Sequence, residues 1–183
     1  PESIADHSYR LSLAALLAAP YCEASPEKSA LIAIAHDLAE SITGDIVPHD
    51  PMGKDAKKKL ETLAMDELND ALCPHKQDNL FISLWNEYEN QSSNEGKLCK
   101  DIDKFEMAIQ AYEYEMAQPH LDLSDFYDSV KDKIKSLEVK SWLNELMRRR
   151  MEFRNNNPIS NTKLDIASYI LNGLNSIEIS PTF

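Results

Sequence analysis

Glycine is scarce in this sequence, with four residues among 183. No glycine-rich loop of the kind that cradles nucleotide phosphates occurs in the chain, and no internal repeat is visible. Runs rich in alanine, leucine, glutamate and lysine dominate instead, and these residues favour helix over sheet. We therefore predict an all-α fold, built as a single helical bundle.

Cysteine and long apolar runs are also scarce. The three cysteines, Cys22, Cys73 and Cys99, are odd in number, widely spaced and outside any CxxC pattern. This usage favours a reducing compartment, the cytoplasm or the nucleus, over a disulfide framework. No apolar stretch approaches the roughly 20 residues of a membrane-spanning helix, so we expect no membrane partner.

Positive charge is in the minority. The 19 lysines and arginines face 31 aspartates and glutamates, which gives a net charge of −12. A protein that binds nucleic acid needs a basic face for the phosphate backbone, so we expect no nucleic-acid partner. A small anionic ligand still fits, provided that a cation neutralises it locally.

The spacing of apolar residues predicts seven helices. They cover about residues 6–19, 26–43, 54–73, 80–88, 92–116, 124–134 and 139–151. Their starts carry capping signals: Asp6, Ser25 before Pro26, and the box Ser92-x-x-Glu95. Gly44 ends the second helix, and residues 45–51, with two prolines, form a loop. We expect residues 1–154 to form the domain and 155–183 to be a linker with a short amphipathic segment.

Three stretches indicate how these helices are placed. Residues 30–35 are apolar all round, which predicts an enclosed, central helix. The lysines at 57–59 are expected to face water. The arginines at 148–150 are expected to close the last helix, where positive charge suits the dipole, rather than to bind an anion.

His36 and Asp37 are the most informative pair in the chain. They lie in a run that is otherwise almost entirely apolar. An imidazole and a carboxylate near a core cost several kcal/mol to desolvate unless something pairs with them. A divalent cation satisfies both, although a buried hydrogen bond between a histidine and a carboxylate would also explain the pair in isolation.

Two further ligands are available from other helices. His7 lies in the first turn of the first helix, and Asp103 adjoins an apolar stripe and should point partly inward. Together with His36 and Asp37 they offer two imidazoles and two carboxylates. This set suits Mn²⁺, Fe²⁺, Co²⁺ or Zn²⁺ and leaves positions open for water and substrate.

Glu40 and Asp45 strengthen the case for a functional site. Glu40 lies one helical turn beyond the His36-Asp37 doublet, and Asp45 follows the glycine that ends the helix. Ionisable groups crowded in this way repel one another or stay protonated without cations, and acids of this kind are functional candidates.

The combined pattern resembles a known family. It matches the H…HD…D signature of the HD-domain superfamily and, more narrowly, the HD-domain 5′-deoxynucleotidases of the bacterial YfbR type and the eukaryotic HD domain-containing protein 2 type, including yeast members. The similarity covers about residues 1–150. It is carried by His7 within 2–10, His36-Asp37 with Glu40 and Gly44-Asp45, Asp103 within 100–107, Gln110-Ala111-x-Glu113-Tyr114 and Asp125-Phe126-Tyr127.

The resemblance implies a role for each matching residue. It implies that His7, His36, Asp37 and Asp103 bind a first divalent ion. It places Glu40 and Asp45 near the attacking water as catalytic groups. In the eukaryotic branch, it also implies that these two acids and the backbone carbonyl of Ile46 are possible ligands of a second ion. The implied cofactor is Co²⁺, Mn²⁺, Mg²⁺ or Zn²⁺. One departure is that the family's Arg-x-Gly-Trp-like segment, which lies before the first histidine and helps to hold the nucleotide, does not occur in this sequence.

The implied activity is hydrolysis of deoxyribonucleoside 5′-monophosphates to deoxyribonucleoside and phosphate by a homodimer. Two alternatives stay open at this point. One is a cyclic-nucleotide phosphodiesterase with the same metal ligands, and the other is a non-catalytic nucleotide-binding protein that is stabilised by its metal. The presence of both Glu40 and Asp45 argues against the second, because a purely structural ion needs neither acid.

Overall fold

The computed structural model describes residues 2–46, 53–73 and 79–159. Within these ranges the chain is helical and contains no strand, which confirms the prediction of an all-α fold. The elements are α1 (Ile4–Ala18), a short 3₁₀ helix (Ala19–Tyr21), α2 (Pro26–Ala35), α3 (Glu40–Thr43), α4 (Lys54–Leu72), α5 (Leu80–Asn90), α6 (Asn94–Ala117), α7 (Ser124–Val130) and α8 (Leu137–Asn156).

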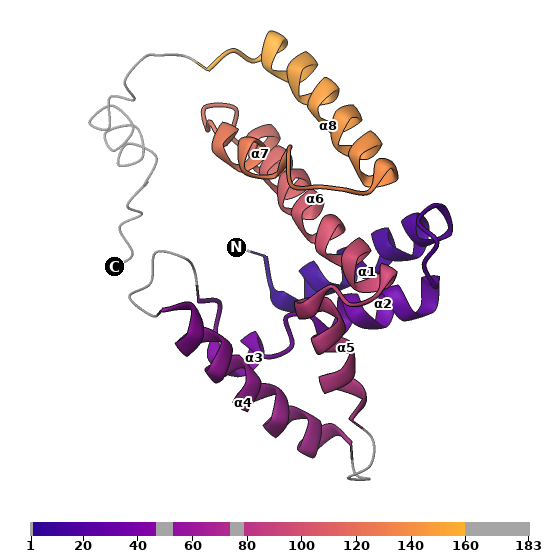
Figure 1. Cartoon of the computed structure of the whole chain (residues 1–183). Helices are drawn as coiled ribbons and strands as arrows, with labels where there is room; N and C mark the ends of the chain where they lie inside the picture. Colours follow the sequence, from indigo (N-terminus) through magenta and orange to yellow (C-terminus); the bar gives the residue numbers. More distant parts are fainter. Residues whose placement is uncertain (1, 47–52, 74–78, 160–183) are drawn as a thin grey trace, which may run out of the picture.

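The long helix α6 organises the bundle. Helices α1, α2 and α5 pack against it, and α7 and α8 pack against it toward the other end of the molecule (Figure 1). Helix α4 lies farther out and contacts α3 and α5. In the described part of the chain, no helix is long and apolar enough to cross a membrane.

Two apolar clusters form the interior. The larger one draws on all the helices around α6 and includes Ala35 at the end of α2. The smaller one lies under α4 and consists of Ala39, Ala64, Met65 and Trp85. His36 and Asp37 therefore stand at the junction of two cores, because the residues on either side of them along the chain belong to different clusters.

The predicted helix 26–43 is broken. Helix α2 ends at Ala35, residues 36–39 form turns, and the single turn of α3 follows. Within the break the amides of Leu38 and Glu40 bond to carbonyls three residues back, at 3.3 and 3.0 Å. Gly44 ends α3 as predicted, with a positive φ of 71° that favours glycine.

The caps differ in part from those expected. Ser3, not Asp6, caps α1, because its hydroxyl accepts from the Asp6 amide at 3.1 Å. Ser25 caps α2 as predicted. At α6 the cap is Ser93, and Glu95 does not complete a capping box with Ser92 but accepts from the amide of Ser25 at 2.9 Å. That contact ties the start of α2 to the start of α6.

The last helices also have different limits. Helix α7 ends at Val130, four residues before the expected end, and α8 continues to Asn156, beyond the predicted domain boundary at 154. The arginines at 148–150 lie inside α8 and do not close it. Two of them pair with acids one turn away, so Arg148 and Arg149 both bind Glu145. The expected amphipathic segment falls outside the described residues, as does most of the 45–51 loop.

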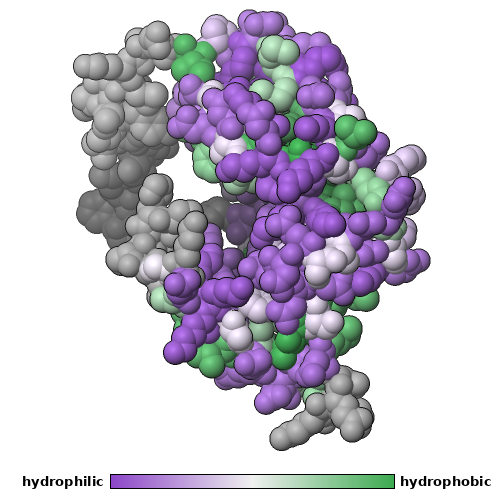
Figure 2. Space-filling view, in the orientation of Figure 1, coloured by the Kyte–Doolittle hydropathy of each residue, from purple (hydrophilic) through white to green (hydrophobic). Residues whose placement is uncertain are grey.

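Several apolar side chains of α4 and α2 are exposed. On α4, Ala64 and Met65 belong to the small core and Leu68 packs against it, whereas Leu60 and Leu63 are 37% and 57% exposed. Helix α4 packs against few neighbours, so only a narrow face is covered. Helix α2 is not enclosed either, because Leu31 and Ile34 are nearly half exposed. The face of the molecule in Figure 2 is nonetheless largely hydrophilic.

Helices α5 and α6 approach each other closely at Gly96. A Cβ atom on this residue would lie 2.3 Å from the carbonyl oxygen of Glu87. Only glycine allows this distance, because real Cβ atoms do not come so near to backbone oxygen. The residue therefore fixes how near the two helices lie.

A buried carboxylate joins α6 to α8. Glu115 is fully buried and accepts from Arg150 at 2.8 and 2.9 Å, from the amide of Leu123 at 2.9 Å, and pairs with Arg154 at 2.8 Å. Burial opposes ionisation of this group, but the hydrogen bonds from the two arginines outweigh it and lower its pKa to about 2. The ionised form is thus part of the folded state.

We predict that Glu115→Gln destabilises the protein by about 3 kcal/mol at neutral pH, because it leaves the partly buried guanidinium groups of Arg150 and Arg154 without their carboxylate. The stabilisation is complete above the ordinary pKa of 4.5 and is lost as the pH falls toward about 2. Urea unfolding of both proteins between pH 7 and pH 3 measures the difference, which should shrink on acidification. Glu145→Gln, at an exposed ion pair, is the control and should unfold like the wild type; a constant difference at all pH values would contradict the prediction.

Candidate metal centre

The break after α2 orients His36, one of the four expected metal ligands. The imidazole of His36 is buried, and its Nδ1 lies 2.7 Å from the carbonyl oxygen of Ala33. A carbonyl only accepts, so Nδ1 carries the proton and Nε2 presents its lone pair. A histidine fixed in this way by a backbone carbonyl is the usual arrangement for a metal ligand.

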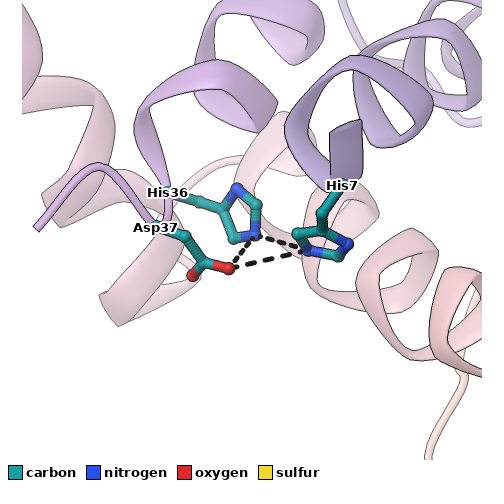
Figure 3. A group of neighbouring side chains, drawn as sticks. All are labelled: His7, His36 and Asp37. Carbon is teal, nitrogen blue, oxygen red and sulfur yellow. Dashed lines mark hydrogen bonds and ion pairs between the residues drawn. The ribbon is translucent and has the colours of Figure 1, made fainter. Parts of the chain in front are cut away.

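Three side chains converge on one point (Figure 3). The Nε2 atom of His36 lies 3.2 Å from Nε2 of His7 and 3.0 Å from Oδ2 of Asp37, and the last two atoms are 3.6 Å apart. All three ligand atoms lie within 4.8 Å of one another. Figure 3 shows the two rings and the carboxylate pointing toward each other, from α1 and from the break after α2.

Asp103 joins this group from α6. Its Oδ1 lies 3.5 Å from Nε2 of His7, and its Oδ2 accepts from the hydroxyl of Tyr88 at 2.7 Å. Burial opposes its ionisation, but the hydrogen bond with His7 outweighs it and lowers the pKa of Asp103 to about 2. The expectation that Asp103 points partly inward agrees with this position. Tyr88, a buried residue of α5, thus holds a candidate ligand in place.

His7 carries a proton in the absence of metal. Burial opposes a charged ring, but hydrogen bonds to Asp103 and Glu106 outweigh it and raise its pKa to about 10. A proton thus supplies the positive charge among these carboxylates. A metal ion takes a neutral imidazole, so it would replace the proton. Two nitrogen and two carboxylate donors fit a divalent transition ion.

Glu106 is a site residue that the sequence analysis missed. Its Oε2 lies 2.9 Å from Nδ1 of His7, and its Oε1 lies 3.0 Å from Nε of Arg10. The side chain is almost fully buried. Its place one helical turn after Asp103 was the available signal, because residues three apart lie on the same face of a helix.

We predict that Glu106→Gln weakens binding of Mn²⁺ by about 10- to 100-fold, because carboxylates that orient a ligating histidine contribute to metal affinity. Isothermal titration calorimetry of the two proteins measures the change. Glu113→Gln, which also removes a partner of Arg10 but does not touch His7, is the matched control. Equal affinities for Glu106→Gln and wild type would contradict this role.

Glu40 and Asp45 are placed differently. Glu40 is half-buried, and burial first, then the charge of Asp37, raises its pKa to about 7. Asp45 is exposed after the Gly44 turn. The carbonyl of Ile46 accepts from the ammonium of Lys57 at 2.7 Å. Among the described residues, neither acid belongs to a compact group of three or more metal-binding side chains.

A cavity of about 500 Å³ opens beside these groups. Its wall includes His36, Asp37, Glu40 and Asp103, so three of the four expected ligands and one expected catalytic acid face the same space. Lys57, expected with its neighbours to face water, also lines it and is only partly exposed; the expectation was therefore wrong for this lysine. Cavities of this size accept small-molecule ligands.

Comparison with known proteins identifies the family. A family model described as "HD domain" matches residues 1–142. The 5′-deoxynucleotidase hdd1 of Schizosaccharomyces pombe is 41% identical over 160 residues, which are 84% of this chain and 78% of the relative. The 5′-deoxynucleotidase HDDC2 of Dictyostelium discoideum is 40% identical over 145 residues, 73% of this chain and 75% of the relative. The solved structure of the HD domain-containing protein YGK1 is 30% identical, with a TM-score of 0.65 over 82% of this chain and 79% of that chain.

The family model and these relatives place the chain in the class of HD-domain phosphohydrolases, and the clustered His7, His36 and Asp37 are candidate ligands for the metal ion of such an enzyme. Within that class, this chain belongs to the HD-domain family of 5′-deoxynucleotidases. The resemblance stated from the sequence is thereby confirmed. The division of the chain at residue 154 stays a prediction.

Proposed function

We propose that this protein hydrolyses deoxyribonucleoside 5′-monophosphates to deoxyribonucleosides and phosphate with the help of a divalent metal ion. The observation that carries the proposal is the convergence of His7, His36 and Asp37, with Asp103 alongside, beside a cavity that His36, Asp37 and Asp103 line. Relatives at about 40% identity are named 5′-deoxynucleotidases, which supports the reaction and the substrate class.

We assign the first ion to His7, His36, Asp37 and Asp103. When bound, such an ion neutralises phosphate charge and lowers the pKa of water so that hydroxide is available near neutral pH. Co²⁺, Mn²⁺, Mg²⁺ and Zn²⁺ are the candidates. Glu106 and the Ala33 carbonyl keep the two imidazoles in the orientation that binding requires.

Glu40 is our candidate general base. Its carboxyl faces the cavity beside Asp37, where it can accept a proton from the water that attacks phosphorus. As the bond from phosphorus to the 5′-oxygen breaks, that oxygen needs a proton, and Glu40 can return the one that it took from the water. We assign Asp45 to orienting that water. The products are then the neutral deoxyribonucleoside and inorganic phosphate.

The homodimer is also part of the proposal. Apolar side chains on α1 and α2 are exposed in the single chain, among them Leu13, Leu16, Leu17, Leu31 and Ile34, at 40–67%. A second copy of the chain would cover such a surface, since exposed apolar patches of this kind mark protein contacts. Light scattering on the purified protein tests the homodimer. We expect the mass of two chains, and the mass of a single chain would contradict the proposal.

The function is tested by supplying the protein with Mn²⁺ or Co²⁺ and measuring phosphate release. We expect release from deoxyribonucleoside 5′-monophosphates, and hydrolysis confined to cyclic nucleotides would favour the phosphodiesterase alternative. If neither is hydrolysed and chelation lowers the melting temperature, the non-catalytic alternative holds. The same assay with ribonucleotides tests the preference for deoxyribose.

A further inference from the structure

Lys100 lies in the same cavity wall as the candidate metal ligand Asp103. Both residues belong to α6 and are three positions apart, so their side chains leave the same face of the helix. Both line the cavity of about 500 Å³ described above. The helix that supplies a metal ligand therefore also supplies a positive charge to the cavity.

The ring of Tyr88 links this charge to the metal centre. The ammonium of Lys100 lies over the ring, 3.8 Å from its centroid, and the hydroxyl of the same tyrosine donates to Oδ2 of Asp103 at 2.7 Å. The imidazole of His36 packs against the ring as well, with the two centroids 4.8 Å apart. Tyr88 is buried and a cation is attracted to an aromatic face, so the ammonium has a defined place beside two candidate ligands.

The ammonium of Lys100 has donors left for a ligand. It pairs with Glu89, whose Oε1 lies 3.5 Å away, which is long for a hydrogen bond. An ammonium has three donors, and the aromatic face below it accepts none of them in a conventional hydrogen bond. The other two lysines of the wall differ, because Lys58 is exposed and Lys57 donates to the carbonyl of Ile46 at 2.7 Å.

The charge of the wall makes such a donor important for an anionic ligand. The described residues that line the cavity bring more carboxylates than ammonium groups: Asp37, Glu40, Glu61, Glu89 and Asp103 against Lys57, Lys58 and Lys100. A phosphate monoester adds further negative charge and has several oxygens, so those that a metal ion does not bind need donors from the protein. Lysine is a common phosphate-binding residue, since its ammonium is a compact charge with several donors.

We propose that Lys100 is a substrate-binding residue, whose ammonium donates to a phosphate oxygen of the nucleotide at the metal centre. The proposal rests on the function proposed above, and it holds for one bound ion or for two. When the phosphate binds, the ammonium exchanges its long contact with Glu89 for a phosphate oxygen. The ring of Tyr88 keeps the side chain in place during this exchange, so little order has to be gained on binding.

The test compares wild type with Lys100→Met, Lys100→Arg and Lys97→Met. Methionine keeps an unbranched apolar stem over Tyr88 but carries no charge, whereas arginine keeps the charge. Lys97→Met is the matched control, because it removes a charge from the same helix at an exposed position that does not line this cavity. Elemental analysis after dialysis measures bound Mn²⁺, and calorimetry measures binding of inorganic phosphate to the Mn²⁺-loaded protein. Steady-state kinetics with deoxyadenosine 5′-monophosphate give kcat/KM.

We expect Lys100→Met to weaken phosphate binding by about 10- to 100-fold, as for loss of a charge-assisted hydrogen bond, with the Mn²⁺ content of the wild type. Its kcat/KM should fall by a similar factor. Lys100→Arg should retain most of the phosphate affinity, and Lys97→Met should bind phosphate as the wild type does.

Three results would overturn the proposal. If Lys100→Met bound phosphate normally, even with a lower melting temperature, Lys100 would only support the packing of α5 on α6. If Lys100→Met lost Mn²⁺ together with phosphate, its effect would be on the metal centre. An equal loss of affinity in Lys97→Met would indicate a general effect of charge. Failure of the wild type to hydrolyse any deoxynucleotide would count against the proposed function, whereas phosphate binding would still report on Lys100.

Discussion

His36→Ala should abolish both metal binding and phosphate release, with activity lowered by at least about a thousandfold. The substitution removes the nitrogen that lies within 3.2 Å of both His7 and Asp37, at the centre of the ligand group. The remaining ligands then lack the buried donor that fixes their common point. Elemental analysis of dialysed protein and a colorimetric phosphate assay measure the two losses.

Two further variants make this result interpretable. His120→Ala removes an exposed histidine and should behave as wild type. Because His36→Ala also leaves the carbonyl of Ala33 without its donor, Asp37→Ala serves as a second test with less structural disturbance. Normal Mn²⁺ content in either ligand variant would refute the assignment of the first ion.

Glu40→Ala should have the opposite combination of effects. We expect the first ion to stay bound, because Glu40 is outside the compact ligand group, and kcat to fall by about 10²- to 10⁴-fold, as for loss of a general base. Mn²⁺ titration and steady-state kinetics on the same preparation measure both quantities. KM should change less than kcat, since the carboxyl is assigned to the water and not to the phosphate.

Glu67→Ala, at an exposed position of α4, is the control for this variant. Glu40→Gln keeps the shape of the side chain and should be nearly as slow as Glu40→Ala. If Glu40→Ala lost Mn²⁺ to the same degree as His36→Ala, the division between metal-binding and catalytic residues would be wrong.

Much of the fold follows from sequence because the relevant signals are local. Helix class comes from composition, and the start of α2 comes from the serine that caps it, whereas the predicted box at Ser92 lies one residue before the actual cap of α6. The ligands were also accessible, since His36, Asp37 and Asp103 are polar groups beside apolar residues and need partners. That these ligands converge on one point could be predicted only from the family resemblance, because no local sequence rule says how α1, α2 and α6 pack together.

Other features depend on contacts that sequence does not encode locally. The break at 36–39 occurs among residues that all tolerate helix, and it is set by the packing of two separate cores. Glu106 and Lys57 resemble the solvated charges of any helix, and only their partners on distant segments reveal them. The three arginines do not end α8. Arg148 and Arg149 pair with Glu145 on the same helix, and Arg150 pairs with Glu115 on α6.

The narrow gap at Gly96 reaches further than its own neighbourhood. Tyr88 belongs to one of the two helices that meet there and Asp103 to the other, and their hydroxyl–carboxylate bond spans the same interface about two helical turns along α6. A methyl group at position 96 would wedge the helices apart and pull the phenol away from its acceptor. Gly96, which has no side chain, thereby helps to fix the orientation of the Asp103 carboxylate, roughly 10 Å away along α6.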